Sequence, residues 1–561
     1  MNRQMLKALS FAMICVTTAA QLASCGKAGG GADGAASAPF FEDIGGGGSK
    51  EESSPAGGAD TGVEAVIRES RIPEYEWQKE VDFPDQAGYT DDTLVMNSEV
   101  PFISFTGQGS LYFSVPEGTE SFDLYVNSVK VDNSSMIGGK SYEVDPGGAV
   151  VNGRNVLQVS DIRPAGGQIH VCIPNPKVLD PGSPDGVINE KAVSLINDII
   201  RSDIEYGFSG AQLAVVKDGR LVYENAWGLL NSYKPDGTRI QDGDPVTTDT
   251  LFDLASNTKM YSVTYAVQYL VTREELTMDT RISDILGPSF YEDTVFIKYE
   301  GYDNPDLSVN KEWKKELTVR NVMMHQAGFP SSPGYHREKY DQEKAEWNTD
   351  VENILYSGSD GSEETRKKTL STIFKTPLMY EPGSKTLYSD VDYMLLCFCI
   401  EKITGQSLDS FLKEKFWQPM GLSHICFNPL ENGFSAKDCA ATELCGNTRD
   451  GVVDFKGIRK DTIQGEVHDE AAWYVMGGVS GHAGMFANAS DLAKLSSLML
   501  TGGYGDKMYF SRNVIDAFSA PQSDISANWG VGWYRKGDEK RAYYFGGDSS
   551  FDTLGHQGWT G

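Results

Sequence analysis

A serine and a lysine three positions apart, Ser256 and Lys259, are the residues whose types and spacing best suit covalent chemistry in this sequence. On one turn of a helix such side chains share a face, with Cβ atoms about 5–6 Å apart, so the amine can reach the hydroxyl. A serine hydroxyl is a weak nucleophile unless a neighbouring base activates it. The spacing therefore predicts a nucleophilic serine whose proton partner is the lysine.

The elements around this pair must hold the serine at the N-terminus of a helix. Ser-x-x-Lys occurs at three other places, Ser24/Lys27, Ser308/Lys311 and Ser410/Lys413. Only Ser256 follows a short apolar approach and precedes an apolar helix, expected over residues 259–272. Unpaired N–H groups at a helix N-terminus favour the negative charge that develops during attack. We therefore expect Ser256 alone of the four to be catalytic.

Further segments match one known superfamily in order and separation: residues 324–330, 381–384, 388–390, 465–470 and 555–561. With the Ser256–Lys259 pair, they make residues 186–561 resemble the serine hydrolases of the class C β-lactamase and penicillin-binding-protein superfamily. The resemblance is strongest to the exported branch called penicillin-binding protein 4B. It implies a mixed α/β fold, in which a β-lactamase/transpeptidase-like antiparallel sheet is flanked by helices.

The same resemblance implies roles for individual residues. Ser256 would be the acylated nucleophile, Lys259 its proton partner, and Tyr388 the relay of a proton to the leaving group. Many relatives have Asn where this chain has Asp390, and a carboxylate beside Lys259 would favour the charged lysine. Our interpretation is that Lys259 stays protonated and holds Tyr388 as the effective base, with Ser256 attacking through it.

The last motif supplies the other side of the predicted site. His556 stands where many relatives have Lys, at the expected start of a strand, and would face the carboxylate or acyl end of a substrate. The resemblance places the oxyanion hole at the backbone N–H groups of Ser256 and Trp559, next to Gly558. Each well-aimed donor there is worth about 3 kcal/mol.

Other histidines have simpler interpretations. A second Gly-His-x-Gly, at residues 481–484, competes with His556, but it runs directly into an apolar segment and a helix expected near Ser490, so we expect it to be a loop wall. His325 and His468 are interpreted as hydrogen-bonded structural histidines. The sequence has no His-Glu-x-x-His motif, and we expect neither a metal nor a cofactor.

The N-terminus has the features of an export signal. Arg3 and Lys7 precede an apolar run over residues 8–20, which is too short to span a bilayer. Residues 22–26 resemble a bacterial lipobox, in which Cys25 is lipidated. We therefore expect residues 1–25 to be a lipoprotein signal peptide. The product would be anchored by Cys25 on the outer side of the cytoplasmic membrane or in the periplasm.

The pattern of residues divides the rest of the chain into three parts. Residues 26–65 are rich in Gly, Ser and Glu and are expected to be a disordered tether. Short alternating strands over residues 66–182 predict a small β-sandwich accessory domain, either a spacer or, by a weak likeness, a sugar-binding module. Residues 186–561 form the hydrolase-like domain. Because relatives continue beyond the motif at 555–561, we expect this sequence to be truncated, as in an incomplete reading of a longer gene. A product that ended at Gly561 would have poor stability and weak or no activity.

Composition limits the partners. The 561 residues include 49 Lys+Arg and 79 Asp+Glu, a formal net charge of −30, and this acidity argues against nucleic acid. The cysteines after Cys25 do not have the spacing of a disulfide framework or a zinc site, so we expect buried free thiols, with Cys439 and Cys445 the one conceivable disulfide.

These observations rank the functions. The first is a lipid-anchored, metal-independent serine hydrolase that forms an acyl-enzyme, a D-alanyl-D-alanine carboxypeptidase acting on peptidoglycan peptides. A carboxylesterase acting on small acyl esters would use the same residues. β-Lactam hydrolysis ranks lower, because nothing marks a deacylating water. From another class, the chain could be a catalytically inactive cell-wall binding protein.

Overall fold

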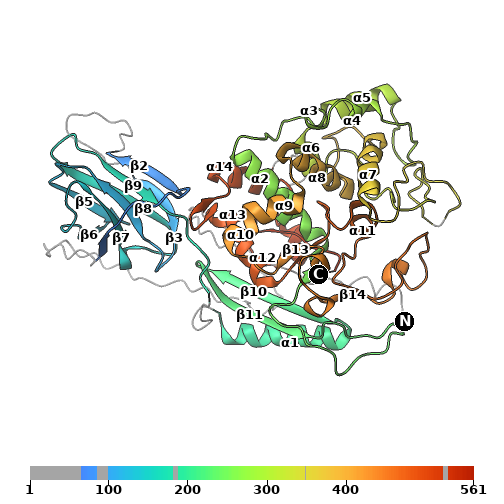
Figure 1. The fold of residues 1–561 in the computed structure, drawn as a ribbon, viewed down its shortest axis with the longest axis horizontal. Helices are drawn as coiled ribbons and strands as arrows, with labels where there is room; N and C mark the ends of the chain where they lie inside the picture. Colours follow the sequence, from blue (N-terminus) through green and yellow to red (C-terminus); the bar gives the residue numbers. More distant parts are fainter. Residues whose placement is uncertain (1–64, 85–98, 181–187, 348, 522–527, 561) are drawn as a thin grey trace, which may run out of the picture.

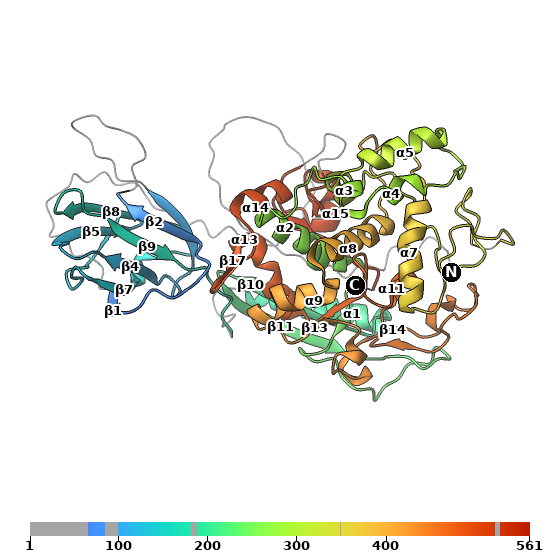
Figure 2. The same cartoon turned by 45° about the horizontal axis from the view of Figure 1, so that its top comes forward.

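The computed structural model describes residues 65–84, 99–180, 188–347, 349–521 and 528–560. The predicted signal peptide with Cys25, and nearly all of the predicted tether, lie outside these described residues. Figure 1 shows a small body of strands beside a larger body of helices and short strands, and Figure 2 shows the same separation after rotation. The mixed α/β fold with antiparallel sheets and helices is confirmed.

The small body consists of two antiparallel sheets with the strand orders β1-β7-β4-β9-β2 and β3-β8-β5-β6. Alternate residues of its strands are buried, as in Leu111, Phe113 and Val115 of β4. Burying two apolar sheet faces against each other removes both from water and holds the sandwich together. The strands are β1 Val66–Glu69, β2 Lys79–Phe83, β3 Val100–Ser104, β4 Leu111–Val115, β5 Ser121–Val126, β6 Val129–Val131, β7 Lys140–Asp145, β8 Gly153–Arg163 and β9 Ile169–Ile173.

The larger body is organised around helix α8, Asp390–Thr404, in which every residue from Val391 to Ile400 is buried. A helix that is apolar all round belongs in an interior. Helices α3, α6, α7 and α9 contact α8. The helices are α1 Glu190–Tyr206, α2 Tyr265–Thr272, α3 Ile282–Leu286, α4 Ser289–Glu292, α5 Leu307–Glu316, α6 Val319–Met323, α7 Glu363–Lys375, α9 Leu408–Leu412, α10 Gln418–Met420, α11 Glu470–Met476, α12 Ala489–Ser496, α13 Leu498–Thr501, α14 Arg512–Ser519 and α15 Ala542–Phe545.

The strands of the larger body form several small antiparallel pairs. Strands β10 and β11 form a hairpin joined at Asp218 and Gly219, whose φ values of 52° and 68° suit a type I′ turn. Helix α1 packs on β11 and α12 on β10. A second sheet has the order β12-β16-β13, and β19 pairs with β20. The strands are β10 Gly210–Lys217, β11 Arg220–Gly228, β12 Phe252–Asp253, β13 Ile425–Phe427, β14 Ala441–Glu443, β15 Ile463–Gln464, β16 Met485–Ala487, β17 Gly503–Tyr504, β18 Lys507–Met508, β19 Tyr534–Arg535 and β20 Leu554–Gly555.

The two bodies are joined by polar contacts. The Arg273 guanidinium donates to the Glu76 carboxylate at 2.6 Å, and the Asn175 amide donates to the Lys507 carbonyl at 3.1 Å. The backbone N–H of Glu76 also donates to the Asp506 carbonyl at 3.0 Å. The residues that make these contacts lie just before strand β2 and just after strand β9 of the sandwich.

The described cysteines are free thiols, as expected, and most of them are buried. Cys439 and Cys445 are not bonded to each other, and every described cysteine except Cys445 is buried. In the described part of the chain, none of the helices combines the length and apolar character that crossing a membrane requires.

Candidate active site

Ser256 lies at the start of a helical run that follows strand β12. A 3₁₀ turn over Ala255–Asn257 leads into a π-helix over Met260–Thr264 and then into α2. The expected helix is therefore present, but it starts with a tighter 3₁₀ turn and continues with a π-helical turn, a feature frequent at functional sites. Ser256 is half-buried while both its neighbours are buried, so its hydroxyl is the part of this turn that a substrate can approach.

The turn that presents Ser256 is strained and braced. Ala255 has φ of 42°, in the left-handed region that costs energy for a residue with a Cβ. The Asp253 carboxylate holds the turn, because Oδ1 accepts from the Ala255 N–H at 2.8 Å and Oδ2 from the His468 N–H at 2.7 Å. His468 is thus a structural neighbour through its backbone.

Lys259 is fully buried and has three hydrogen-bond partners. Its Nζ donates to Ser256 Oγ at 3.0 Å, to Asp390 Oδ1 at 2.8 Å and to the His482 carbonyl at 3.0 Å. Ser256 and Lys259 share a helical face as predicted, and the N-terminus of α8 brings Asp390 to them. The loop at residues 481–484, expected to be a wall, contributes a backbone acceptor to the site.

Tyr388 completes the group around the serine. Its hydroxyl is hydrogen-bonded to Ser256, and its ring centroid lies 4.7 Å from Lys259 Nζ. Burial, with the negative charge of Asp390, raises the pKa of Tyr388 well above its usual value. The phenol is therefore neutral at physiological pH. The structure thus brings four of the predicted residues, Ser256, Lys259, Tyr388 and Asp390, into one hydrogen-bonded cluster.

A buried pair supports Tyr388 from behind. The His325 ring packs against Tyr388 at an interplanar angle of 42° with centroids 4.5 Å apart, and its Nδ1 lies 2.8 Å from Asp392 Oδ2. Burial lowers the pKa of His325 and raises the pKa of Asp392, each well away from its usual value. Burial thus disfavours the charged form of both groups, which pack together under the phenol.

His556 follows strand β20 and does not begin a new strand, so the expectation of a strand starting at Gly555 is wrong. Its Nδ1 lies 2.8 Å from the Gln557 carbonyl, and its ring lies 4.4 Å from that of Tyr534. Burial and the charges of Lys259 and Arg541 lower the pKa of His556 to about 3. The imidazole is consequently neutral, unlike the lysine of many relatives.

Asn257 connects the His556 segment to the nucleophile. With its amide oriented to satisfy both atoms, Asn257 donates to the His556 carbonyl at 3.1 Å and accepts from the Gly558 N–H at 3.2 Å. Gly558 therefore positions this segment, while the Trp559 side chain is 82% exposed. The oxyanion role of the Ser256 and Trp559 N–H groups stays a prediction.

Three groups with metal-ligand chemistry lie beside Lys259. Donor atoms of Asp390, Asp469 and His482 are within 4.8 Å of one another. Asp469 Oδ1 lies 2.8 Å from His482 Nε2, and although burial acts to raise the pKa of Asp469, the His482 charge and hydrogen bond lower it overall. Lys259 Nζ donates to one of these groups, the Asp390 carboxylate, and to the backbone carbonyl of His482.

Comparison with known proteins places this site in a family. The Beta-lactamase family profile matches residues 196–561. An *Escherichia coli* K12 protein named "Putative D-alanyl-D-alanine carboxypeptidase" is 40% identical over 388 residues, covering 68% of this chain and 81% of that protein. A *Salmonella typhi* protein of the same name is 40% identical over 388 residues, covering 68% and 82%.

Solved structures also align with the chain, at low identity. A penicillin-binding protein homologue from *Caulobacter crescentus* aligns with 17% identity and a TM-score of 0.43, covering 65% of this chain and 85% of that one. The hydrolase EstCE1 aligns with 19% identity and a TM-score of 0.45, covering 65% and 87%.

The chain belongs to the Beta-lactamase family, and it is a serine hydrolase of the penicillin-binding-protein and β-lactamase type. The superfamily predicted from the sequence is confirmed. Its assignment to the penicillin-binding protein 4B branch stays a prediction.

Proposed function

We propose that this serine hydrolase is a D-alanyl-D-alanine carboxypeptidase that acts through an acyl-enzyme on Ser256. The observation that carries the proposal is that Ser256 is held between an amine and a phenol, with hydrogen bonds to Lys259 and Tyr388. Such a hydroxyl can be oriented for attack and can lose its proton along a defined path. The names of the E. coli and Salmonella relatives support a substrate that ends in D-alanyl-D-alanine.

Lys259 acts in this proposal as a fixed cation. An ammonium has three N–H donors and no acceptor, and Lys259 has three partners. Two of these, the Asp390 carboxylate and the His482 carbonyl, can only accept. In this proposal the Asp390 carboxylate, 2.8 Å away, favours the ammonium form of Lys259, which orients Ser256 Oγ and stabilises the negative charge that develops there.

Tyr388 then relays the proton. As Ser256 Oγ bonds to the substrate carbonyl carbon, its proton passes to the Tyr388 oxygen, and the phenol proton passes to the leaving D-alanine nitrogen as the C–N bond breaks. Tyr388 is a neutral phenol before and after the step, as its raised pKa requires. In deacylation the relay runs in reverse, with water giving its proton to Tyr388 and Ser256 regaining one.

The test compares three substrates. A peptide ending in D-Ala-D-Ala, a fluorescent penicillin and a small activated ester are offered to the wild type and to Ser256→Ala. Ser410→Ala, at another Ser-x-x-Lys, is the matched control. We expect D-alanine release and penicillin labelling that Ser256→Ala alone abolishes. Ester turnover without either would point to a carboxylesterase, and no reaction with any probe would point to a binding protein.

We also propose that the protein is exported and lipid-anchored through Cys25, as its lipobox-like segment suggests. This places the site in the compartment that contains peptidoglycan peptides. Expression with a radiolabelled fatty acid should label the wild type and leave Cys25→Ala unlabelled and released from membranes. Equal labelling of the two proteins would contradict the proposal.

A further inference from the structure

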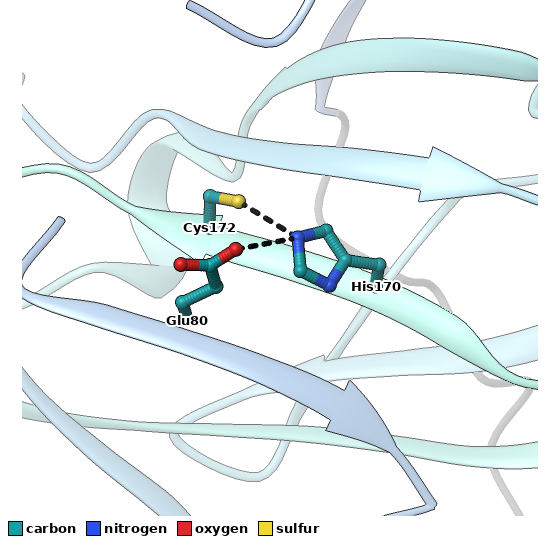
Figure 3. A group of neighbouring side chains, drawn as sticks. All are labelled: Glu80, His170 and Cys172. Carbon is teal, nitrogen blue, oxygen red and sulfur yellow. Dashed lines mark hydrogen bonds and ion pairs between the residues drawn. The ribbon is translucent and has the colours of Figure 1, made fainter. Parts of the chain in front are cut away.

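The outer face of the sandwich carries a second group of chemistry-bearing side chains, on strands β2 and β9. These strands pair antiparallel, with Glu80 opposite Cys172 and Asp82 opposite His170. The intervening Val171 is buried in the sandwich core. Because side chains alternate across a sheet, all four polar side chains share the opposite face. Figure 3 shows Glu80, His170 and Cys172 converging there.

The distances suit a common ligand. His170 Nε2 lies 3.2 Å from Cys172 Sγ and 3.3 Å from Glu80 Oε1. All three donor atoms lie within 4.8 Å of one another. Ligands around a tetrahedral zinc ion are about 3.3–3.8 Å apart when metal–ligand bonds are about 2.0–2.3 Å. The two distances to His170 Nε2 are within a few tenths of an ångström of such separations, and the third pair of donor atoms lies within 4.8 Å.

Asp82 occupies the position of a supporting carboxylate. Its Oδ1 lies 2.8 Å from His170 Nδ1, the ring nitrogen that faces away from Glu80 and Cys172. A metal-bound histidine typically donates its other N–H to a carboxylate, which fixes the tautomer and the ring orientation. With Nδ1 donating to Asp82, a neutral imidazole presents the lone pair of Nε2 to the thiol and the second carboxylate.

Burial and charge at the cluster favour a cation. Cys172 is 1% exposed at its base, whereas the Glu80 side chain is 60% exposed at its rim. Within the described residues, neither Glu80 nor Asp82 forms an ion pair with a lysine or arginine. The face therefore concentrates negative charge beside a buried thiol and leaves one side open to solvent.

We propose that Glu80, His170 and Cys172 bind one divalent metal ion, and that zinc is the ion their chemistry fits best. A thiolate, an imidazole and a carboxylate are the ligand types of zinc sites. On binding, the Cys172 S–H proton passes to solvent and the sulfur bonds to the metal. Water can complete the coordination on the exposed side.

The ion would fasten an edge strand. β2 is the last strand of its sheet, and it begins just after Glu76, which contacts Arg273 of the larger body. β9 ends just before Asn175, which contacts Lys507. A metal bridging the two strands would therefore stabilise the segment through which the sandwich holds the hydrolase. Cysteine spacing does not reveal such a site, because its ligands come from strands far apart in the sequence.

Cobalt provides the test, because Co²⁺ replaces Zn²⁺ in such sites and a cobalt–thiolate bond absorbs in the near ultraviolet. The full chain, treated with a chelator and kept reduced, is titrated with Co²⁺ and then with Zn²⁺. We expect one equivalent of Co²⁺ with a thiolate charge-transfer band, displaced by Zn²⁺. Zn²⁺ should also raise the unfolding temperature.

Two variants and a control decide the outcome. Cys172→Ser should lose the band, whereas Cys439→Ser, which removes an equally buried thiol of the larger body, should keep it. Asp82→Asn, at an exposed side chain, should weaken zinc binding about 10- to 100-fold. The absence of a thiolate band in the wild type, its persistence in Cys172→Ser, or cobalt bound without the band would overturn the proposal.

Discussion

Replacing Tyr388 by Phe removes one hydroxyl and leaves the ring packing in place. The ring contacts of Tyr388 with His325, at 4.5 Å, and with Lys259 Nζ, at 4.7 Å, do not involve the hydroxyl. We therefore expect Tyr388→Phe to fold like the wild type. What it loses is the relay between Ser256 and the leaving group.

The size of the loss follows from that role. A positioned proton donor or acceptor contributes about 10²- to 10⁴-fold, which is about 3–5 kcal/mol of activation free energy. We expect kcat/KM for a D-Ala-D-Ala peptide to fall by this factor, about as much as in Lys259→Ala. The loss should be smaller with a p-nitrophenyl ester, because that leaving group departs without a proton.

The assay measures the acylation rate of each variant with both substrates. Tyr393→Phe is the matched control, because Tyr393 is also buried near Lys259 but donates to the Met323 carbonyl at 3.2 Å. Acylation of Tyr388→Phe within about tenfold of the wild type, or an equal loss with both substrates, would refute the relay.

Three further predictions follow from the charges around the site. Asp390→Ala leaves the buried Lys259 ammonium without its counter-ion. Because Asp390 is 28% exposed, we expect the free energy of unfolding to fall by the low end of the usual cost, about 3 kcal/mol, in a denaturant titration. Unchanged stability would contradict this. Because the pKa of His556 is lowered to about 3, its imidazole is uncharged above that pH, and kcat/KM should show no inflection from it between about pH 5 and pH 8; an inflection removed by His556→Gln would show otherwise. The Arg541 charge contributes to lowering the pKa of His556, so Arg541 acts on this side of the site. Arg541→Ala should raise KM for peptides with a free terminal carboxylate and leave ester hydrolysis unchanged. Equal effects on both substrates would exclude a role in carboxylate binding.

Sequence reasoning predicted the local part of the site well. The Ser256–Lys259 contact follows from helical spacing alone, and the resemblance added Tyr388 and Asp390, which the fold brings to the same point. The hairpin was predictable because its Asp-Gly turn is a local signal. The π-helix after Lys259 was not predictable, because packing against the rest of the larger body decides between α-helical and π-helical winding.

Long-range contacts set the limit of such reasoning. Asp392 and Asp469 were missed because their partners, His325 and His482, come from other loops and only the fold shows the pairing. Asp469 lies in the family-like segment 465–470, and a second signal was its place immediately before helix α11, where its side chain accepts from a backbone N–H. Asn257 was missed although it lies beside the nucleophile, because its partners belong to the His556 segment.

Mass spectrometry of the protein, first intact and then digested, tests the central claim most directly. The protein is incubated with a penicillin, quenched and digested to find the modified residue. The account predicts one acyl group per chain, carried by Ser256, and none on Ser256→Ala. An acyl group on another residue, or equal labelling of Ser256→Ala, would contradict it.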